Sequence, residues 1–271
     1  YNTALGAGAL GANTGSNNTG LGRNALNVHS SGNNNTAVGK DALVASTTAA
    51  NNTAVGLLAG GATTTGHRNT VMGSYAHDAC TVGRYNTVMG FEALTTDIDG
   101  DYSVAIGYEA LKTQESDGAQ QAVMNVAVGA GAGQLLTTGI KNTFVGGQCG
   151  QAGTITGAEN TGVGYYALYT LAGGAYNTGI GKAALYLVAG GDYNTAVGFG
   201  AGAAVTSGDN NLFLGKDAGA SGSPGGAIST GSNEIVLGDE NITEAHIQVD
   251  WTVASDERDK TDIEDLDVGL E

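Results

Sequence analysis

Few residues of this chain have the types and spacing that covalent chemistry needs. Ser255, Arg258 and Lys260 lie together in one short acidic segment. A serine hydroxyl becomes a nucleophile beside a base, and a lysine can be that base when its pKa is depressed. The structural alternative is that Ser255 caps a short helix or turn while Arg258 and Lys260 are solvated. The segment by itself leaves both interpretations open.

The cysteines and histidines show no spacing typical of a metal or redox site. Cys80 and Cys149 are four repeats apart in the pattern described below, or about 19 Å at roughly 4.8 Å per strand. A disulfide needs Cα atoms within about 7 Å, so the two cannot pair within one chain. The four histidines are scattered through the sequence: His29, His67, His77 and His246. We therefore predict no metal and no cofactor.

A short sequence repeat, with a period of about 17 residues, organises most of the chain. The motif Asn-Thr-x-Val-Gly begins thirteen times at a nearly constant spacing, with a degenerate copy at Ser103. The other copies begin at Asn2, Asn18, Asn35, Asn52, Asn69, Asn86, Asn125, Asn142, Asn160, Asn177, Asn194 and Asn211. Helical repeats need more than about 30 residues, so this period is too short for them. The sequence predicts an all-β fold, a parallel β-solenoid or β-roll of about thirteen coils.

Composition excludes several other classes. The 271 residues include 47 glycines but one proline, without the period of collagen, and no apolar run approaches the roughly 18 residues of a membrane span. The net charge is −16, and no basic stripe exists for nucleic-acid phosphates. We therefore expect neither nucleic-acid binding nor membrane insertion. The opening at Tyr1, without an initiator methionine, suggests a piece of a longer chain.

Each coil is expected to contain two short strands, the motif itself and a following Ala-Leu unit such as Ala42-Leu43. Within the motif, the Thr and Val slots are expected to face the core, and the small residue between them to face outward. The glycine after Val is expected to have a positive φ at a corner. The repeated Asn is expected to form a hydrogen-bonded ladder between neighbouring coils.

An outward row of small residues would be unusual against water, so it predicts association with other copies. The row includes Ala37, Ala54, Ala105 and Ala196. A thin coil with a core of Val, Leu and Ala buries a low fraction of its surface, which also favours an oligomer.

Four tyrosines precede the motif asparagine in neighbouring coils: Tyr85 and Tyr102, then Tyr176 and Tyr193. Their rings are expected to stack in pairs. Exposed aromatic faces bind sugars, which makes these four residues candidate receptor contacts. The alternative is that stacking only stabilises the turn. The longer turns at 112–124 and 216–232 are also places where a ligand site could lie, and the alternative is that they are surface loops without a ligand.

The repeats resemble two known groups of proteins. Asn-Thr-Ala-Val-Gly and Ser-Val-Ala-Ile-Gly are similar to head repeats of trimeric autotransporter adhesins, in which three left-handed β-rolls surround one axis. Those heads usually have a shorter repeat, so the coils of this chain are expected to have longer turns. Asn-Thr-Ala-Val-Gly-x-x-Ala-Leu is similar to repeats of bacteriophage tail fibres. The resemblance covers about residues 1–219 and implies a homotrimer.

A second resemblance lies at Ser255–Ile263. This segment matches the pattern Ser-Asp-x-Arg-x-Lys-x-x-Ile, with which the intramolecular chaperone domain of phage tail fibres and tailspikes opens. The resemblance implies a trimerisation chaperone that can cleave itself before Ser255. It would make Ser255 the nucleophile, Lys260 the activating base, and Asp256 and Arg258 supporting residues. Only the start of that domain, including its first helix at about 262–271, would lie in this chain.

Together these features predict a solenoid shaft at 1–219, a neck or cap at 220–254 and the start of a chaperone at 255–271. The expected function is structural and adhesive, as part of a phage tail fibre in the virion. Its expected partners are two further copies, other tail proteins and a host surface receptor such as a glycan. Apart from self-cleavage, no enzyme activity is expected.

Two rivals remain at this stage. The first is the head of a trimeric adhesin on a bacterial cell surface. The second is an ice-binding solenoid, which requires a flat outward Thr-x-Thr array on successive coils, whereas the repeat Thr is expected to face inward.

Overall fold

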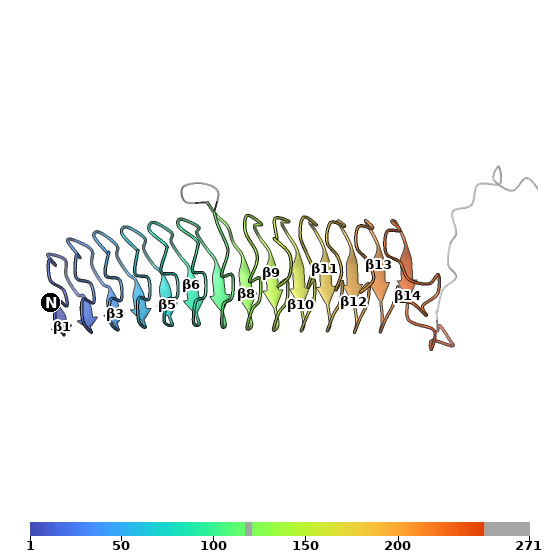
Figure 1. Cartoon of the computed structure of the whole chain (residues 1–271), viewed down its shortest axis with the longest axis horizontal. Coiled ribbons are helices and arrows are strands. Elements are labelled where there is room, and N and C mark those ends of the chain that lie inside the picture. The colour runs from blue at the N-terminus through green and yellow to red at the C-terminus, as the bar shows by residue number, and fades with distance from the viewer. Residues whose placement is uncertain (117–120, 247–271) are drawn as a thin grey trace, which may run out of the picture. The chain divides into compact units, whose positions relative to one another are not determined.

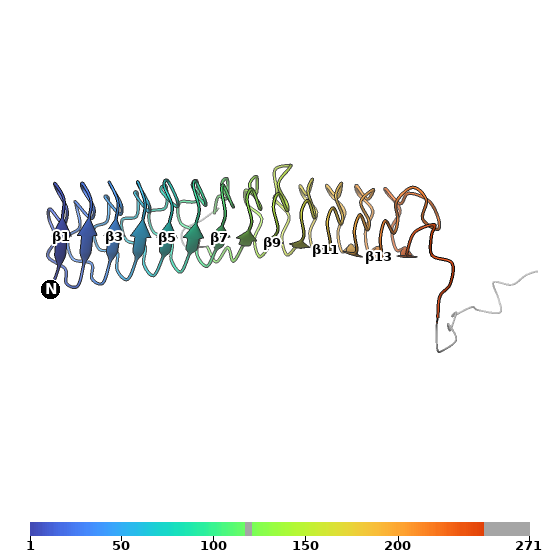
Figure 2. The same cartoon turned by 90° about the horizontal axis from the view of Figure 1, so that it is seen from below.

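The computed structural model describes residues 1–116 and 121–246. The chain divides into two units, Tyr1–Asn241 and Ile242–Glu271. All strands of the described residues lie in the first unit, and none of those residues is helical. Each coil leaves the row of strands, turns back, and returns one step further along (Figures 1 and 2).

Fourteen strands of three residues form one parallel sheet in chain order. They are β1 (Thr3–Leu5), β2 (Thr19–Leu21), β3 (Thr36–Val38), β4 (Thr53–Val55), β5 (Thr70–Met72), β6 (Thr87–Met89), β7 (Val104–Ile106), β8 (Val126–Val128), β9 (Thr143–Val145), β10 (Thr161–Val163), β11 (Thr178–Ile180), β12 (Thr195–Val197), β13 (Leu212–Leu214) and β14 (Ile235–Leu237). Equivalent motif positions pair throughout, as in Thr36 with Thr53. The predicted parallel β-solenoid is confirmed, and so is the expected length of its repeating coil. The last strand, β14, lies within the segment 220–254 that was expected to form a neck.

The Ala-Leu unit of each coil is a turn, so the expected second strand is wrong. Leu43, for example, has a φ of 48° and Leu94 a φ of 51°, in the left-handed region. The backbone is nevertheless bonded between coils, because Leu43 N donates to Ala59 O at 3.0 Å. Left-handed residues curl the chain too sharply for an extended strand, and five coils have glycine at this slot: Gly60, Gly133, Gly150, Gly202 and Gly219.

The facing predicted for the strand is reversed in the structure. The middle residue points into the coil, and Ala37, Ala54, Ala105 and Ala196 are all fully buried. The flanking residues point outward, as in Val197, whose exposed fraction is 39%. The outward small row, and association through it, are therefore wrong. Val145, expected in the core, is an outward residue of β9 with intermediate exposure.

The middle residue of the strand faces inward because the coil is thin. The turn opposite the strand brings Leu side chains so close that little more than a methyl group fits between. A methyl placed on Gly179 would lie 3.1 Å from Ala184 O and 3.4 Å from Leu168 Cγ. Small residues are thus favoured inside wherever the turn presents Leu, because close packing leaves few voids.

Two coils satisfy the same spatial constraint with a large residue in the strand and glycine in the turn. Phe144 fills the middle slot of β9, and the Leu slots of its own and the preceding coil are Gly150 and Gly133. Methyl groups on these glycines would lie 2.8 and 3.0 Å from the Phe144 ring. Phe213 has the same relation to Gly219 and Gly202. A large residue in the middle of the strand is therefore accompanied by glycine at the Leu slots, which is an exchange of volume between strand and turn.

The motif asparagines form the predicted ladder, buried inside the coil. Asn35 illustrates it: its backbone N and its Nδ2 donate to Asn18 Oδ1 at 2.9 and 3.1 Å. Its Nδ2 also donates to Ala49 O at 2.8 Å. In turn, Asn35 Oδ1 accepts from Asn52 N of the next coil at 3.0 Å. The Asn35 amide thus joins its own coil to both neighbours, which satisfies buried polar groups that would otherwise be costly.

The glycine that follows each Val slot has the predicted positive φ. Gly22, with a φ of 133°, is representative. A Cβ there would also clash with Gly39 O in the next coil. Both the backbone conformation and the close approach of neighbouring coils therefore require glycine.

A third interior line, here called the corner row, contains the residue three positions after each Leu slot in most coils. Its members are His29, Ser46, Thr63, Cys80, Asp97, Gln114, Leu136, Ile155, Leu171, Val188, Val205 and Ile228, and all are buried. The first six are polar residues or cysteine, and the last six are aliphatic. The interior therefore changes character between the coils of β7 and β8.

Candidate functional site

The four tyrosines named as receptor contacts lie in the turn just before the strand. Each has a positive φ, between 59° and 64°. Their backbone N–H groups bond to the preceding coil, as Tyr85 N does to His67 O at 3.2 Å. This conformation directs the ring out of the coil, and exposed fractions range from 37% for Tyr85 to 57% for Tyr193.

The rings stack in the two predicted pairs. Tyr85 and Tyr102 have ring centroids 4.9 Å apart and planes 3° from parallel. Tyr176 and Tyr193 are 4.8 Å apart at 2°. Their inner faces are occupied by each other, so the outer faces, edges and hydroxyls remain for a ligand. The stacking also fits the purely structural role in the turn.

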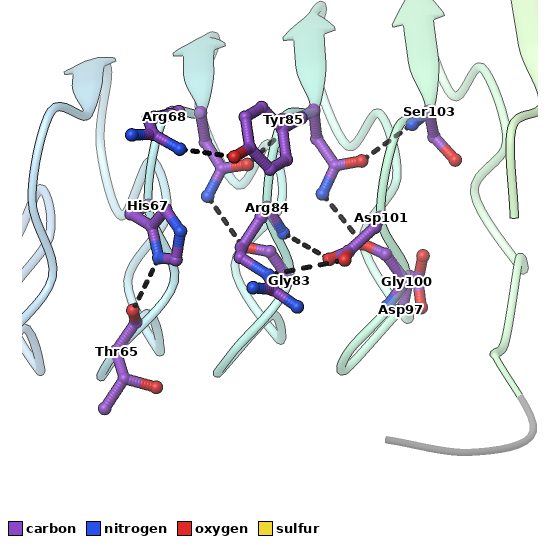
Figure 3. Close-up of polar contacts among 12 residues, drawn as sticks. Thr65, His67, Arg68, Gly83, Arg84, Tyr85, Asp97, Gly100, Asp101 and Ser103 are labelled. Carbon is purple, nitrogen blue, oxygen red and sulfur yellow. Dashed lines mark hydrogen bonds and ion pairs between the residues drawn. The ribbon is translucent and has the colours of Figure 1, made fainter. Parts of the chain in front are cut away.

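The outer side of Tyr85 is partly covered. The Arg68 guanidinium lies 5.3 Å from the ring centroid and donates to the Tyr85 hydroxyl, and the His67 ring meets Tyr85 edge-on at 6.0 Å. Nearby, Arg84 Nε lies 3.3 Å from Asp101 Oδ2 (Figure 3). This pair of rings is therefore held within a network of polar contacts.

Tyr193 borders a shallow hollow of about 360 Å³, formed with residues of the β12, β13 and β14 coils. At the edge of this hollow, Asn210 Nδ2 donates to Asn233 Oδ1 at 2.8 Å. The ring of Tyr193 therefore has more open space beside it than the ring of Tyr85, which Arg68 and His67 partly cover.

Sequence reasoning missed a second aromatic surface, on the turns that follow the strands. Phe91 and Tyr108 stack at 5.9 Å and 8°, and Tyr169 and Tyr186 at 5.0 Å and 6°. Tyr166 touches the edges of the latter pair. The two members of each stacked pair are one repeat apart, so the period that identified the first row also contains the signal for these.

The buried cysteines and His77 are structural residues of the interior. Burial raises the pKa of the Cys80 and Cys149 thiols to about 12, so both remain neutral. Both cysteines are free, which fits the prediction that they do not pair. Burial lowers the pKa of His77 to about 4, although Asp97 opposes the shift. A neutral thiol is a poor nucleophile, and these residues do not form a reactive centre.

Within residues 1–116 and 121–246, no three His, Cys, Asp or Glu side chains are grouped to bind a metal ion. In that same part of the chain, no helix has the length and apolar character to span a membrane. The residues proposed for self-cleavage, Ser255, Asp256, Arg258 and Lys260, lie outside the described residues.

Comparison of the chain with protein-family models, with curated proteins and with solved structures finds no match.

Proposed function

We propose that this chain is a structural and adhesive segment of a trimeric tail fibre, in which three solenoids join through their strand faces. The observation that carries the proposal is the outward face of the sheet. None of the fourteen strands contains a charged residue, although residues 1–241 contain 16 acidic and 8 basic residues, a net charge of −8. An uncharged, partly apolar face along a whole acidic solenoid is typical of an interaction surface.

The outward face consists of two rows. One is mostly Thr, and the other contains only Val, Leu, Ile and Met. Exposed fractions in the second row reach 41% at Leu21, 40% at Met72 and 41% at Ile180. Fourteen strands about 4.8 Å apart give a face roughly 60 Å long and 10 Å wide. That is comparable with the roughly 800 Å² per partner of a stable interface.

Light scattering of the whole chain tests the association. The expected mass is that of three chains. Val55→Arg and Val197→Arg should each shift the mass toward one chain, because each places a charge in the uncharged face. Asn51→Arg is the matched control, since Arg68 already occupies the same slot one coil further on with the same φ of 61°. A wild-type monomer would contradict the proposal.

The proposed self-cleavage is tested in a chain that carries a complete chaperone domain after Ile263. We expect cleavage between Ala254 and Ser255. Ser255→Ala should leave one long band on a denaturing gel, because the nucleophile is lost, and Lys260→Ala should slow the reaction. An intact wild-type chain after complete folding would contradict this part of the proposal while leaving the trimer standing.

The head of a bacterial trimeric adhesin remains an alternative with the same solenoid and the same expected mass. The gene distinguishes the two, because an adhesin requires a membrane-anchor barrel downstream and a tail fibre requires the rest of the chaperone.

Ice binding is a second candidate, favoured by one outward row of threonines, although the other outward row is aliphatic and does not supply the second Thr of a Thr-x-Thr array. Six successive coils, from Thr3 to Thr87, and four more, from Thr143 to Thr195, present Thr on the strand face. Thermal hysteresis of the freezing point, lost in a Thr53→Val and Thr70→Val double variant, would support it. No effect on ice growth at millimolar concentration would exclude it.

A further inference from the structure

The residue directly after each corner glycine forms a row along the solenoid, here called the post-strand row, whose aromatic members are Phe91, Tyr108, Tyr165 and Phe199. This row has a gap in its middle. Consecutive coils contribute Tyr108, Ala130, Gly147 and Tyr165 to this row, so two small residues separate two tyrosines. The result is a groove of about 270 Å³ whose floor also includes Gly131. Three coil steps of about 4.8 Å place the two tyrosines roughly 14 Å apart along the solenoid.

The walls of the groove are exposed aromatic rings. Tyr108 has an exposed fraction of 56% and Tyr165 of 45%. The Tyr165 hydroxyl donates to Gln148 Oε1 at 3.0 Å, which fixes that ring at the edge of the groove. A methyl group on Gly147 would lie 3.3 Å from Tyr165 Cδ2, so the glycine keeps the base of this wall open.

A chain of amides and one carboxylate lines the side of the groove. Gln151 Nε2 donates to Gln134 Oε1 at 2.8 Å, and Gln134 Nε2 donates to Glu109 Oε2. Lys112 Nζ donates to Glu109 Oε1 at 2.7 Å, and this bond lowers the pKa of the carboxyl. Glu109 is therefore ionised at neutral pH, and it is the only charged residue among those that line the groove.

We infer that this groove binds a short neutral oligosaccharide. A pyranose ring has apolar C–H faces, which suit exposed tyrosine rings, and hydroxyls that both donate and accept hydrogen bonds. The glutamine amides supply both functions, and the Glu109 carboxylate accepts. Binding sites for small ligands commonly combine such aromatic walls with a few fixed polar groups.

The charge of the site selects against acidic sugars, because Glu109 would repel a carboxylate or sulfate. The inference rests on the adhesive role proposed above, which it deepens by naming a ligand class and a site. It does not depend on the strand-face interface.

The experiment is a saturation-transfer NMR screen of the whole chain, followed by calorimetry. The probes are maltotriose, lacto-N-tetraose and the trisaccharide of N-acetylglucosamine, with sialyllactose as the acidic comparison. At least one neutral probe should bind, and more tightly than sialyllactose. Tyr108→Ala and Tyr165→Ala should each weaken binding tenfold or more. Ala130→Tyr should abolish it, because a third ring of the same row would fill the gap.

Phe199→Ala is the matched control, since Phe199 occupies the same row outside the groove and is 51% exposed. It should leave binding unchanged, and all four variants should keep the melting temperature and mass of the wild type. The site is overturned if no neutral probe binds at millimolar concentration, or if Ala130→Tyr binds like the wild type. A trimer without sugar binding would overturn the site alone, whereas a sugar-binding monomer would overturn the trimeric fibre alone.

Discussion

The first and second halves of this solenoid have the same backbone and different interiors. In the coils from His29 to Gln114, the corner row is polar apart from Cys80, and in those from Leu136 to Ile228 it is entirely aliphatic. The strand register and the positive-φ glycines continue unchanged across both halves, whereas the asparagine ladder runs within each half and is interrupted at Ser103, where Asn125 Nδ2 instead donates to Gln114 Oε1. The coil shape is therefore set by the strand motif and the turns, and the corner row is free to vary in chemistry.

In the polar half, most buried polar side chains of the interior have hydrogen-bond partners. His29 Nδ1 lies 3.0 Å from Ser46 Oγ, and His29 Nε2 lies 2.8 Å from Gly32 O. Asp97 accepts from Gln114 Nε2 at 2.5 Å and from Ser116 Oγ at 2.9 Å. The network is incomplete at His77, whose Nδ1 has no partner among the described residues.

The corner row of the aliphatic half has no polar groups that require partners and gains from close packing alone. A satisfied polar network specifies one arrangement, but it contributes less to the free energy of unfolding than apolar packing of the same volume. We therefore expect the aliphatic half to be the more stable one.

A carboxylate in the aliphatic half should cause the largest effect. In Val188→Asp, the new charge would be buried without the donors that surround Asp97, at a cost of several kcal/mol. We expect the variant to be unfolded or insoluble. Gly190→Asp is the control, because a methyl placed there meets nothing within 4 Å. Circular dichroism melts compare the two, and equal melting temperatures would refute the assignment of Val188 to the interior.

Removing the Phe144 ring should cause the second-largest loss of stability. Phe144→Ala leaves a cavity bounded by two glycines and should cost about 3–5 kcal/mol in the free energy of unfolding. Adding Gly150→Leu should recover much of that loss, because it recreates the Ala and Leu pairing of other coils, whose Leu slots share the positive φ. Denaturant unfolding measures both variants. A double variant no more stable than Phe144→Ala would contradict the exchange of volume between strand and turn.

His77 should make the polar half sensitive to pH. Its pKa is lowered from 6.5 to about 4 in the folded chain, so between these values the unfolded chain binds more protons. Stability should therefore fall as the pH falls, by about 2 kcal/mol between pH 7.5 and pH 5. His77→Leu, which introduces the residue found in the neighbouring coil at Leu94, should remove this part of the pH dependence. Denaturant midpoints at both pH values test it, and an unchanged pH dependence in the variant would refute it.

The two buried cysteines allow a finer comparison. Neither thiol should react with a thiol reagent in the closed coil, because burial keeps both protonated. Reaction should follow local opening, several times faster at Cys80 in the polar half than at Cys149 in the aliphatic half. Mass spectrometry of each labelled peptide measures the two rates. Faster labelling of Cys149 would reverse the expected order.

The repeat period, the parallel sheet, the asparagine ladder and the glycine corners could all be predicted from the sequence, because each follows from repetition of the same residue types. The facing of the strand could not, since Thr-Ala-Val has small or apolar residues on both sides. The facing is indicated by a correlation between the middle residue of the strand and the Leu slot of the turn. Phe144 and Phe213 occupy the middle position in coils whose adjacent Leu slots are glycine. The candidate tyrosine pairs could be predicted from their spacing, whereas the groove between Tyr108 and Tyr165 depends on two small residues whose importance appears only when the coils are stacked.

Hydrogen exchange of the whole chain, followed by mass spectrometry of its peptides, tests the division into two interiors most directly. Backbone amides that bond between coils exchange only when the coils open, so their rates report local stability. Leaving aside the end coils, amides of the β3–β6 coils should exchange faster than those of the β9–β12 coils. Equal protection in the two halves, or greater protection of β3–β6, would contradict the account.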